Sequence, residues 1–323
     1  MGKELCPAPP TVYPCGVPQK QELLYFDRYE GRLRAESIYG EKSVRWAYES
    51  ALGRVFLEGA VKRPWFSRLY GAWADSPSSA KEIAPFLARF GVDPAEFLLP
   101  PESFRTFNEF FHRELRPGAR PLAPGETTVA FPADGRHLLI PDLSREAPIY
   151  AKGRRFDLAK FLGSEALAER FRGGSAVLSR LCPTDYHRFH FPLEGETGTP
   201  RLINGPLYSV SPVALARSLR YLYENKRRVT EVRHPVIGSY LFLEIGATNV
   251  GSIVDTAPFE IRVAKGQEKG YFRFGGSMTA TVFPADAFTP AADLTQQSAA
   301  GIELYARVGD RMGEIHAKKS GCP

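Results

Sequence analysis

Residues 271–279 read YFRFGGSMT, and this stretch decides how the whole chain is interpreted. Aromatic residues precede Gly275 and Gly276 in the stretch YFRF, and the largely apolar residues 279–283 follow Ser277. Two adjacent glycines let the backbone take strained or left-handed conformations, so the Ser277 hydroxyl can come within reach of the Gly276 carbonyl carbon. Taken alone, the tripeptide favours a glycine bulge inside a strand. The alternative, a serine that attacks its own backbone, needs support from elsewhere in the chain.

An acid and a pair of histidines lie in two further segments, FPADG at residues 131–135 and DYHRFHFP at residues 185–192. Asp134, His187 and His190, together with the serine, are the parts of a proton-relay nucleophile. Each segment also has a simpler interpretation. The Asp-Gly step is a good two-residue turn between strands, and the histidines could be partly buried strand residues.

A fourth segment, residues 107–121, reads FNEFFHRELRPGARP and is predicted to form an amphipathic helix that ends at the Pro-Gly step. Together with PADG, YHRFHFPLEG and KGQEKGYFRFGGS, in this order and spacing, it resembles the phosphatidylserine decarboxylase family. The resemblance runs from about Tyr39 to Phe283. Met278 stands where the family usually has threonine or serine, and Phe131 stands where serine is common. Neither departure removes a reacting group, but Met278 leaves the substrate open, because the wider family includes soluble amino-acid decarboxylases.

The resemblance implies that the chain cuts itself between Gly276 and Ser277. Ser277 attacks the Gly276 carbonyl to form an ester, and elimination and hydrolysis leave residue 277 as a covalent pyruvoyl group, the expected cofactor. The products are a β chain of residues 1–276 and an α chain of residues 277–323. The pyruvoyl ketone then forms a Schiff base with the amine of phosphatidylserine and accepts the electron pair as carbon dioxide leaves. The product is phosphatidylethanolamine.

Three side chains are assigned roles in this chemistry. His190 is the candidate base that activates Ser277, and Asp134 is the candidate group that fixes the tautomer of that base. His187 is the candidate acid that protonates the carbanion. Residues three apart in a strand point to opposite faces. Either a bulge or turn therefore interrupts the strand between the two histidines, or only one of them faces the site.

Two other functions stay open. One is a soluble pyruvoyl-dependent decarboxylase of a free amino acid, and the other is a non-catalytic lipid-binding homologue that kept the fold. Only the two enzymes would be found as two fragments. Vesicle binding would then separate the lipid enzyme from the soluble one.

The 323-residue chain has a net charge of +6, with 43% hydrophobic and 24% charged residues, which fits a soluble globular protein. The excess of basic over acidic residues favours anionic partners. The sequence shows no nucleic-acid-binding signature. The four cysteines show no C-x-x-C spacing and no zinc pattern with the histidines, so no metal site is expected. Because the sequence shows neither an apolar run of about eighteen residues nor a signal peptide, the expected location is peripheral, on the cytoplasmic face of the cell membrane.

The predicted fold class is α+β, with an N-terminal helical region followed by an antiparallel β-rich catalytic domain. Residues 1–20 are expected to form an extended arm, and residues 21–120 a helical region that could associate with a membrane. Residues 121–323 are expected to form the catalytic domain, which is self-cleaved.

Local patterns support this division. Helical spacing covers residues 43–59, a second helix starts at Pro64, and a capped helix ends at Gly91. Short β-rich runs punctuated by glycine and proline follow at residues 129–131, 137–140, 176–181, 240–245, 259–263, 271–274 and 301–308. Helical pieces interrupt these runs near residues 157–161 and 212–223.

The segment from Glu41 to Trp73 combines surplus positive charge with the aromatic residues Trp46, Trp65, Phe66, Tyr70 and Trp73. Basic residues beside tryptophan and tyrosine are typical of an interfacial helix. Packing of the same helices on the catalytic domain produces the same periodicity, so both interpretations stay open. The expected partners are phosphatidylserine, an anionic membrane surface, the chain's own α and β fragments and a second copy in a homodimer, but no nucleic acid.

Overall fold

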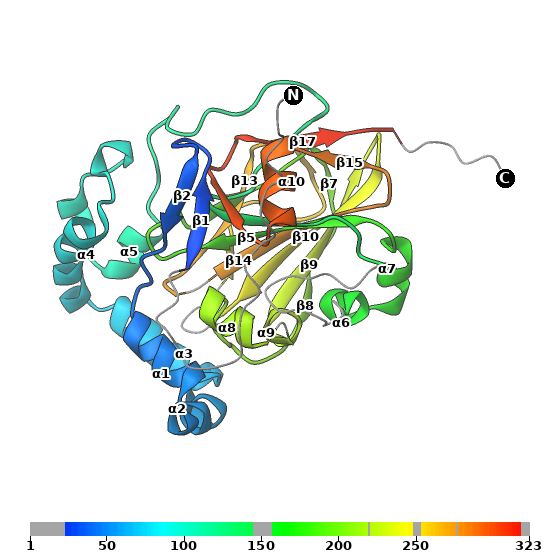
Figure 1. Ribbon diagram of the computed structural model, residues 1–323. Coiled ribbons are helices and arrows are strands. Elements are labelled where there is room, and N and C mark those ends of the chain that lie inside the picture. Colours follow the sequence, from blue (N-terminus) through cyan, green and yellow to red (C-terminus); the bar gives the residue numbers. More distant parts are fainter. Residues whose placement is uncertain (1–22, 145–156, 219, 248–252, 276, 318–323) are drawn as a thin grey trace, which may run out of the picture.

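The computed structural model of the protein describes residues 23–144, 157–218, 220–247, 253–275 and 277–317. The predicted arm of residues 1–20 and the cleavage-site residue Gly276 lie outside these described residues. Figure 1 shows the strands gathered at the centre of the molecule, with the N-terminal helices, coloured blue and cyan, at one side. This arrangement confirms the predicted α+β class.

An eleven-stranded sheet dominates the described part of the chain, with the strand order β12-β7-β9-β10-β14-β5-β4-β16-β1-β2 and β8 attached to β9. Its strands are β1 (Leu24–Asp27), β2 (Arg32–Ala35), β4 (Gly135–Ile140), β5 (Ser175–Leu181), β7 (Gly195–Thr197), β8 (Arg201–Ile203), β9 (Arg227–His234), β10 (Gly238–Gly246), β12 (Arg262–Val263), β14 (Ser277–Phe283) and β16 (Glu303–Ala306). Neighbouring strands are antiparallel, except that β1 runs parallel to β16.

Two smaller sheets and five helices complete the described catalytic part. The sheets are β11 (Ile253–Asp255), β13 (Glu268–Phe272) and β6 (Arg188–His190), and β15 (Phe288–Pro290), β17 (Arg311–Ile315) and β3 (Thr128–Ala130). The helices are α6 (Leu158–Leu162), α7 (Glu165–Arg170), α8 (Pro212–Arg217), α9 (Arg220–Glu224) and α10 (Ala292–Ala299).

Strand β14 lies between β10 and β5, and its side chains alternate between two hydrophobic cores. Met278 and Val282 belong to the core that α6, α8 and α9 cover. Phe283 belongs to the other core, to which the main sheet and both small sheets contribute. By the alternation, Ser277 faces the same side as Phe283. Met278 therefore points away from the serine's face and fills the core beneath the helices.

The predicted helical region of residues 21–120 does not begin with a helix. Strands β1 and β2 form a hairpin that extends the main sheet, because β1 pairs with β16. The remaining elements are α1 (Glu41–Glu49), α2 (Ala51–Phe56), the π-helix η1 (Leu57–Val61), α3 (Pro64–Ala74), η2 (Pro77–Glu82), α4 (Ile83–Phe90), η3 (Pro94–Glu96), η4 (Pro101–Ser103) and α5 (Phe107–Phe111). The predicted helix start at Pro64 and the left-handed cap at Gly91 are confirmed. No helix within the described ranges is long and apolar enough to cross a membrane.

The predicted helix of residues 107–121 is much shorter than the sequence suggested. Thr106 caps its start by accepting a hydrogen bond from the Glu109 N–H at 3.1 Å, but α5 ends at Phe111 rather than at the Pro-Gly step. The chain beyond it is extended, because the Glu114 carbonyl accepts from the Leu98 N–H at 2.9 Å and the Arg116 N–H donates to Glu96 at 2.9 Å. Tertiary pairing therefore outweighs the helical periodicity after residue 111.

The segment that follows the predicted cut contributes strands to the main sheet and to the small sheet β15-β17-β3. Strand β14 lies between β10 and β5, β16 lies between β4 and β1, and β17 lies between β15 and β3. Backbone hydrogen bonds on both sides of each strand hold it in place. A chain cut before Ser277 would therefore keep its two pieces together without a covalent link.

His137 is buried in the main sheet and generates a prediction about acid stability. The Ala306 carbonyl can only accept, so the ring Nε2–H donates to it at 3.2 Å, and Nδ1 accepts from Ser179 Oγ at 2.8 Å. Burial lowers the pKa of His137 to about 3. The unfolded chain binds this proton near pH 6.5 and the folded chain does not, so stability should fall as the pH drops below about 6.5.

We expect His137 to lower the free energy of unfolding by roughly 2 kcal/mol between pH 7 and pH 5, above the range in which most carboxylates titrate. Urea unfolding at several pH values measures this slope. The variant His137→Gln should have a shallower slope than the parent, and the variant of the exposed His316→Gln should match the parent. Equal slopes for all three proteins would contradict the prediction.

Candidate active site

Ser277 is the first residue of β14 and is completely buried. It pairs with Gly246 of β10 on one side and with Leu181 of β5 on the other, so the sheet fixes the backbone on the C-terminal side of the predicted cut. Gly275 has a φ of 141°, a conformation that side chains rarely adopt. The glycine-rich approach thus has the conformational role that the sequence suggested.

His187 contacts the serine hydroxyl. The distance from Ser277 Oγ to His187 Nδ1 is 3.2 Å, and His187 Nε2 lies 2.8 Å from the carbonyl oxygen of Cys182. Since a carbonyl oxygen only accepts hydrogen bonds, the proton of a neutral ring must be on Nε2. The lone pair of Nδ1 therefore faces the hydroxyl of Ser277, as a base must.

The environment of His187 keeps its ring neutral and fixed. The ring is fully buried and stacks on Phe111, with the ring centroids 3.8 Å apart. Burial lowers the pKa of His187 to about 3, and the positive charge of Arg113 acts in the same direction. An uncharged imidazole in a rigid orientation can take a proton from a neighbouring group at neutral pH.

The turn from Cys182 to His187 is held by an ion pair. The Asp185 carboxylate accepts from the Cys182 N–H at 2.7 Å and forms a salt bridge with Arg136 at 2.6 Å. Burial raises the pKa of Asp185, and Arg136 opposes this effect. The Cys182 carbonyl that orients His187 therefore belongs to a turn with few degrees of freedom.

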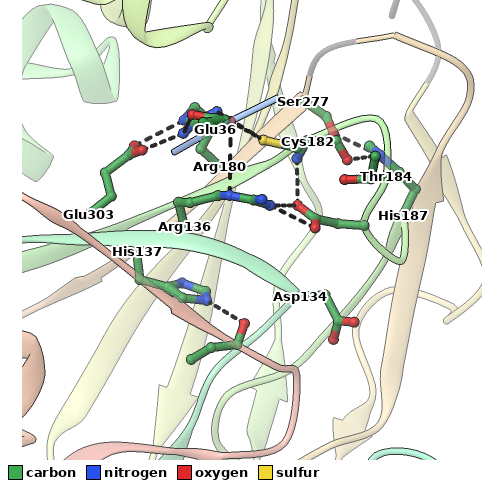
Figure 2. Close-up of polar contacts among 12 residues, drawn as sticks. Glu36, Asp134, Arg136, His137, Arg180, Cys182, Thr184, His187, Ser277 and Glu303 are labelled. Carbon is green, nitrogen blue, oxygen red and sulfur yellow. Dashed lines mark hydrogen bonds and ion pairs between the residues drawn. The ribbon is translucent and has the colours of Figure 1, made fainter. Parts of the chain in front are cut away.

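Further buried charges surround this turn (Figure 2). Arg180 pairs with Glu36 at 2.8 Å and also with Glu303, and the Cys182 thiol donates to Glu36 at 2.6 Å. Burial alone would raise the pKa of Glu36, but Arg180 and Arg136 lower it to about 2. Glu36 follows β2, whereas Glu303 lies in β16, so the network joins distant parts of the chain next to the site.

His190 and Asp134 lie elsewhere than the sequence predicted. His190 Nδ1 is 3.0 Å from the Gly266 carbonyl, and its buried Nε2 has no hydrogen-bond partner among the described residues. Asp134 binds Arg120 at 2.7 Å and accepts from the Val308 N–H at 2.9 Å. Figure 2 draws no contact from Asp134 to either Ser277 or His187. The structure thus corrects the expected pairing, because His187 rather than His190 contacts the serine; the catalytic roles stay predictions.

The two histidines lie at different places relative to strand β6, which resolves the geometric difficulty noted from the sequence. Strand β6 begins at Arg188, so His187 precedes it and His190 ends it. The opposite strand is also irregular, because the register shifts between Glu268 and Gly270 of β13. His187, which lies outside the strand, contacts the serine, so the alternation of a regular strand does not relate the two rings.

A cavity of about 660 Å³ lies beside the serine. Cys182 and Gly275 line it at the end near the site, and the N-terminal helices contribute the aromatic residues Trp46, Phe56 and Phe66. The cavity thus connects the surroundings of Ser277 with the helices that the sequence identified as a possible membrane surface. Its size is that of pockets that hold extended small molecules.

The sequence motifs contained the groups that hold His187 without revealing what they do. Phe111 lies inside FNEFFHRELRPGARP, and Asp185 begins DYHRFHFP. Their place inside a motif was the available signal. Cysteine spacing and zinc binding were the only reasons to consider Cys182 from the sequence, whereas its backbone carbonyl is what contacts His187. Glu36 had no local signal at all, because its partners Arg136 and Arg180 are 100 and 144 residues away.

Comparisons with known proteins agree with this site. The family profile described as phosphatidylserine decarboxylase matches residues 107–314. A phosphatidylserine decarboxylase proenzyme from Chlamydia muridarum is 38% identical over 296 residues, which cover 92% of this chain and 98% of the relative. The proenzymes from Clostridium novyi (38% identity, 89% of this chain and 98% of the relative) and Desulfitobacterium hafniense (35% identity, 92% and 100%) match similarly.

The matched range spans the positions of Phe111, Cys182, His187 and Ser277. The resemblance inferred from the four sequence segments is thereby confirmed, as is the predicted enzyme class. Similarity of this extent shows that the chain is a carboxy-lyase and belongs to the phosphatidylserine decarboxylase family.

Proposed function

We propose that this protein cuts itself before Ser277 and then converts phosphatidylserine to phosphatidylethanolamine by means of a pyruvoyl group at residue 277. The observation that carries the proposal is the 3.2 Å contact between the buried Ser277 hydroxyl and the unprotonated nitrogen of His187. The relatives are named proenzymes, which supports a cut during maturation.

The surroundings of residue 277 fit a pyruvoyl group. The residue is buried, Gly275 two residues before it has a φ of 141°, and a neutral imidazole faces it. Burial excludes water, which would otherwise compete for the reacting groups. When formed, this group supplies a ketone for the substrate amine and a sink for the electron pair that carbon dioxide leaves behind.

In turnover, His187 is the residue placed to move protons at this position. Its Nδ1 is free to accept a proton from the substrate ammonium, and the same nitrogen can return that proton to the carbon that loses carbon dioxide. The Cys182 carbonyl holds the other ring nitrogen throughout. The low pKa of His187 ensures that the ring begins each cycle uncharged.

In maturation, we retain His190 as the proposed base and Asp134 as its electrostatic support. Burial and, to a smaller extent, Arg188 lower the pKa of His190, but the hydrogen bond to the Gly266 carbonyl and the charges of Glu268 and Asp134 oppose that effect. At His187, in contrast, Arg113 disfavours a positive ring. An imidazolium is therefore better stabilised at His190, whose unpartnered Nε2 must come within reach of the hydroxyl in the reacting precursor.

The cavity favours a lipid over a free amino acid. A volume of about 660 Å³ with aromatic walls exceeds what an amino acid alone would fill. Two of its charged lining residues, Glu36 and Arg180, are paired with each other. Lys42, at the start of α1, is exposed and could meet the lipid phosphate. The non-catalytic alternative is disfavoured because the groups needed for catalysis are all present.

The N-terminal helices also support a peripheral membrane location, which we propose to be the cytoplasmic face of the cell membrane. Leu52, Val55 and Leu69 are between 67% and 77% exposed, and Trp65 is 54% exposed. A group of exposed apolar side chains commonly marks a membrane or protein contact. Other aromatic residues pack inward, since Tyr70 stacks on Phe274 with ring centroids 5.4 Å apart. Membrane association and packing on the catalytic domain therefore both apply to this segment, on different faces of the same helices.

The first prediction concerns the nucleophile. Ser277→Ala should remain a single polypeptide of about 35.9 kDa, because the hydroxyl that attacks the preceding carbonyl is gone. Mass spectrometry of the purified protein gives the result directly, with the parent yielding residues 1–276 and 277–323. If the variant still splits before residue 277, the serine is not the nucleophile.

The second prediction separates the two histidines. His187→Ala should form both fragments yet lose decarboxylation by roughly 10²–10⁴-fold, the usual effect of losing a general acid or base. His190→Ala should stay uncut. The exposed His316→Ala serves as the control and should behave as the parent in both assays. An uncut His187→Ala protein would show that His187 is the base in maturation, and that the two roles are exchanged.

The third prediction concerns the membrane surface. Changing Leu52, Val55 and Leu69 to serine should weaken binding to anionic vesicles in co-sedimentation, with a larger loss at high salt because screening removes the charge contribution. Leu202→Ser is the matched control, since Leu202 is 50% exposed on β8, outside the helices. Binding that is unchanged in the triple variant would place the membrane contact elsewhere, and no binding by the parent would favour a soluble substrate.

A further inference from the structure

Arg113 is a buried cation whose hydrogen bonds go to backbone carbonyls. It is 4% exposed, and its Nη2 donates to the carbonyls of Thr184 and Asp185, both at 3.3 Å. Its guanidinium carbon lies 4.7 Å from the centre of the Phe97 ring and 4.9 Å from that of Phe110. A buried charge is costly unless it is paired. Among the described residues no carboxylate forms an ion pair with Arg113, so its position requires an explanation.

The location of Arg113 relates it to the reacting groups. Phe111, two residues earlier, stacks on the His187 ring at 3.8 Å. The carbonyls that Arg113 binds belong to the turn between Cys182 and His187, and the Cys182 carbonyl fixes the His187 tautomer. The end of α5 therefore holds both the imidazole and the turn that carries it.

We infer that Arg113 is a positioning residue for the reaction at residue 277, which holds the 182–187 turn in place and keeps His187 uncharged with Nδ1 toward Ser277. This inference rests on the proposed function. It assigns a role to a residue that touches neither the serine nor the cavity lining.

The charges around His187 are consistent with this role. Arg113 approaches from the segment just after α5, and Asp185 and Arg136 form an ion pair behind the turn. Beyond Cys182, Arg180 pairs with both Glu36 and Glu303. The negative charges on that side are thus matched by guanidinium groups. Burial comes first in lowering the pKa of His187, and Arg113 is the charged group that adds to it. Burial also lowers the pKa of Arg113 to about 10, which leaves it charged at neutral pH.

Two substitutions separate the charge from the geometry. Arg113→Met keeps an unbranched side chain but removes the charge and the donors. Arg113→Lys keeps the charge, but a single ammonium cannot reproduce the planar fork that binds two carbonyls and packs against aromatic rings. Arg105→Met is the matched control, because the Arg105 side chain is 84% exposed and, within the described residues, forms its ion pair with Glu109 of α5.

The experiment measures decarboxylation by the processed variants across pH. For Arg113→Met we expect kcat to fall roughly 10–100-fold with little change in KM, as for a misplaced catalytic group. We also expect the acid limb of its kcat–pH profile to move up by about one pH unit, because a positive charge near His187 has been removed. Arg113→Lys should keep the parent's acid limb but recover only part of kcat. Parent-like rates and pH profiles in both Arg113 variants would overturn the inference.

A second readout does not depend on activity and so distinguishes failure of this inference from failure of the proposed function. In the uncut Ser277→Ala protein, histidine side-chain ¹⁵N shifts report the protonation of His187 directly. Replacing Arg113 with Met in that protein should let His187 protonate at a higher pH, and replacing it with Lys should not. If the His187 titration is the same in all three proteins, Arg113 does not act on it, whatever the enzyme's substrate proves to be.

Discussion

The hydrogen bond from the His187 ring to the Cys182 carbonyl determines which nitrogen of the ring faces Ser277. A neutral imidazole has one donor and one acceptor nitrogen, and this bond commits the donor to the backbone. The acceptor nitrogen must then face Ser277. Had the carbonyl contacted the other nitrogen, the same residues would offer the hydroxyl an N–H instead of a lone pair. The Asp185–Arg136 ion pair holds this carbonyl through the Cys182 N–H, so buried charge serves orientation here.

The position of Ser277 imposes a second constraint on the fold. The proposed cut lies next to a buried residue, yet its products must stay folded. Placing the serine at the first position of a central strand meets both needs, since β14 pairs with β10 and β5 on its two sides. Strands β16 and β17 also follow the proposed cut. Each pairs on both sides, β16 in the main sheet and β17 in a small sheet. The Arg180–Glu303 ion pair adds a side-chain link between the two sides of the cut.

Much of the architecture could be predicted from local patterns, and the remainder depended on contacts that are distant in sequence. The α+β class, the helix start at Pro64 and the Gly91 cap follow from periodicity and from backbone preferences of single residues. Strand β9 was missed because Arg227, Arg228 and Arg233 hide its alternation, although Arg227 and Arg228 are largely buried by tertiary partners. The motifs contained both histidines, but only the fold could show that His187 contacts a serine 90 residues away.

The buried charges beside the site explain why so polar a centre can coexist with an apolar cavity. Two guanidinium groups, Arg136 and Arg180, stand among three carboxylates, Glu36, Asp185 and Glu303. Such groups add little net stability over apolar residues, but breaking one contact leaves an uncompensated charge, which is strongly unfavourable. The network therefore tolerates only one arrangement of the segments that carry it. Because Glu36, Arg180 and Cys182 also line the cavity, the same constraint fixes the wall next to the reacting serine. Specificity of conformation, rather than stability, is what this polar wall contributes to the active site.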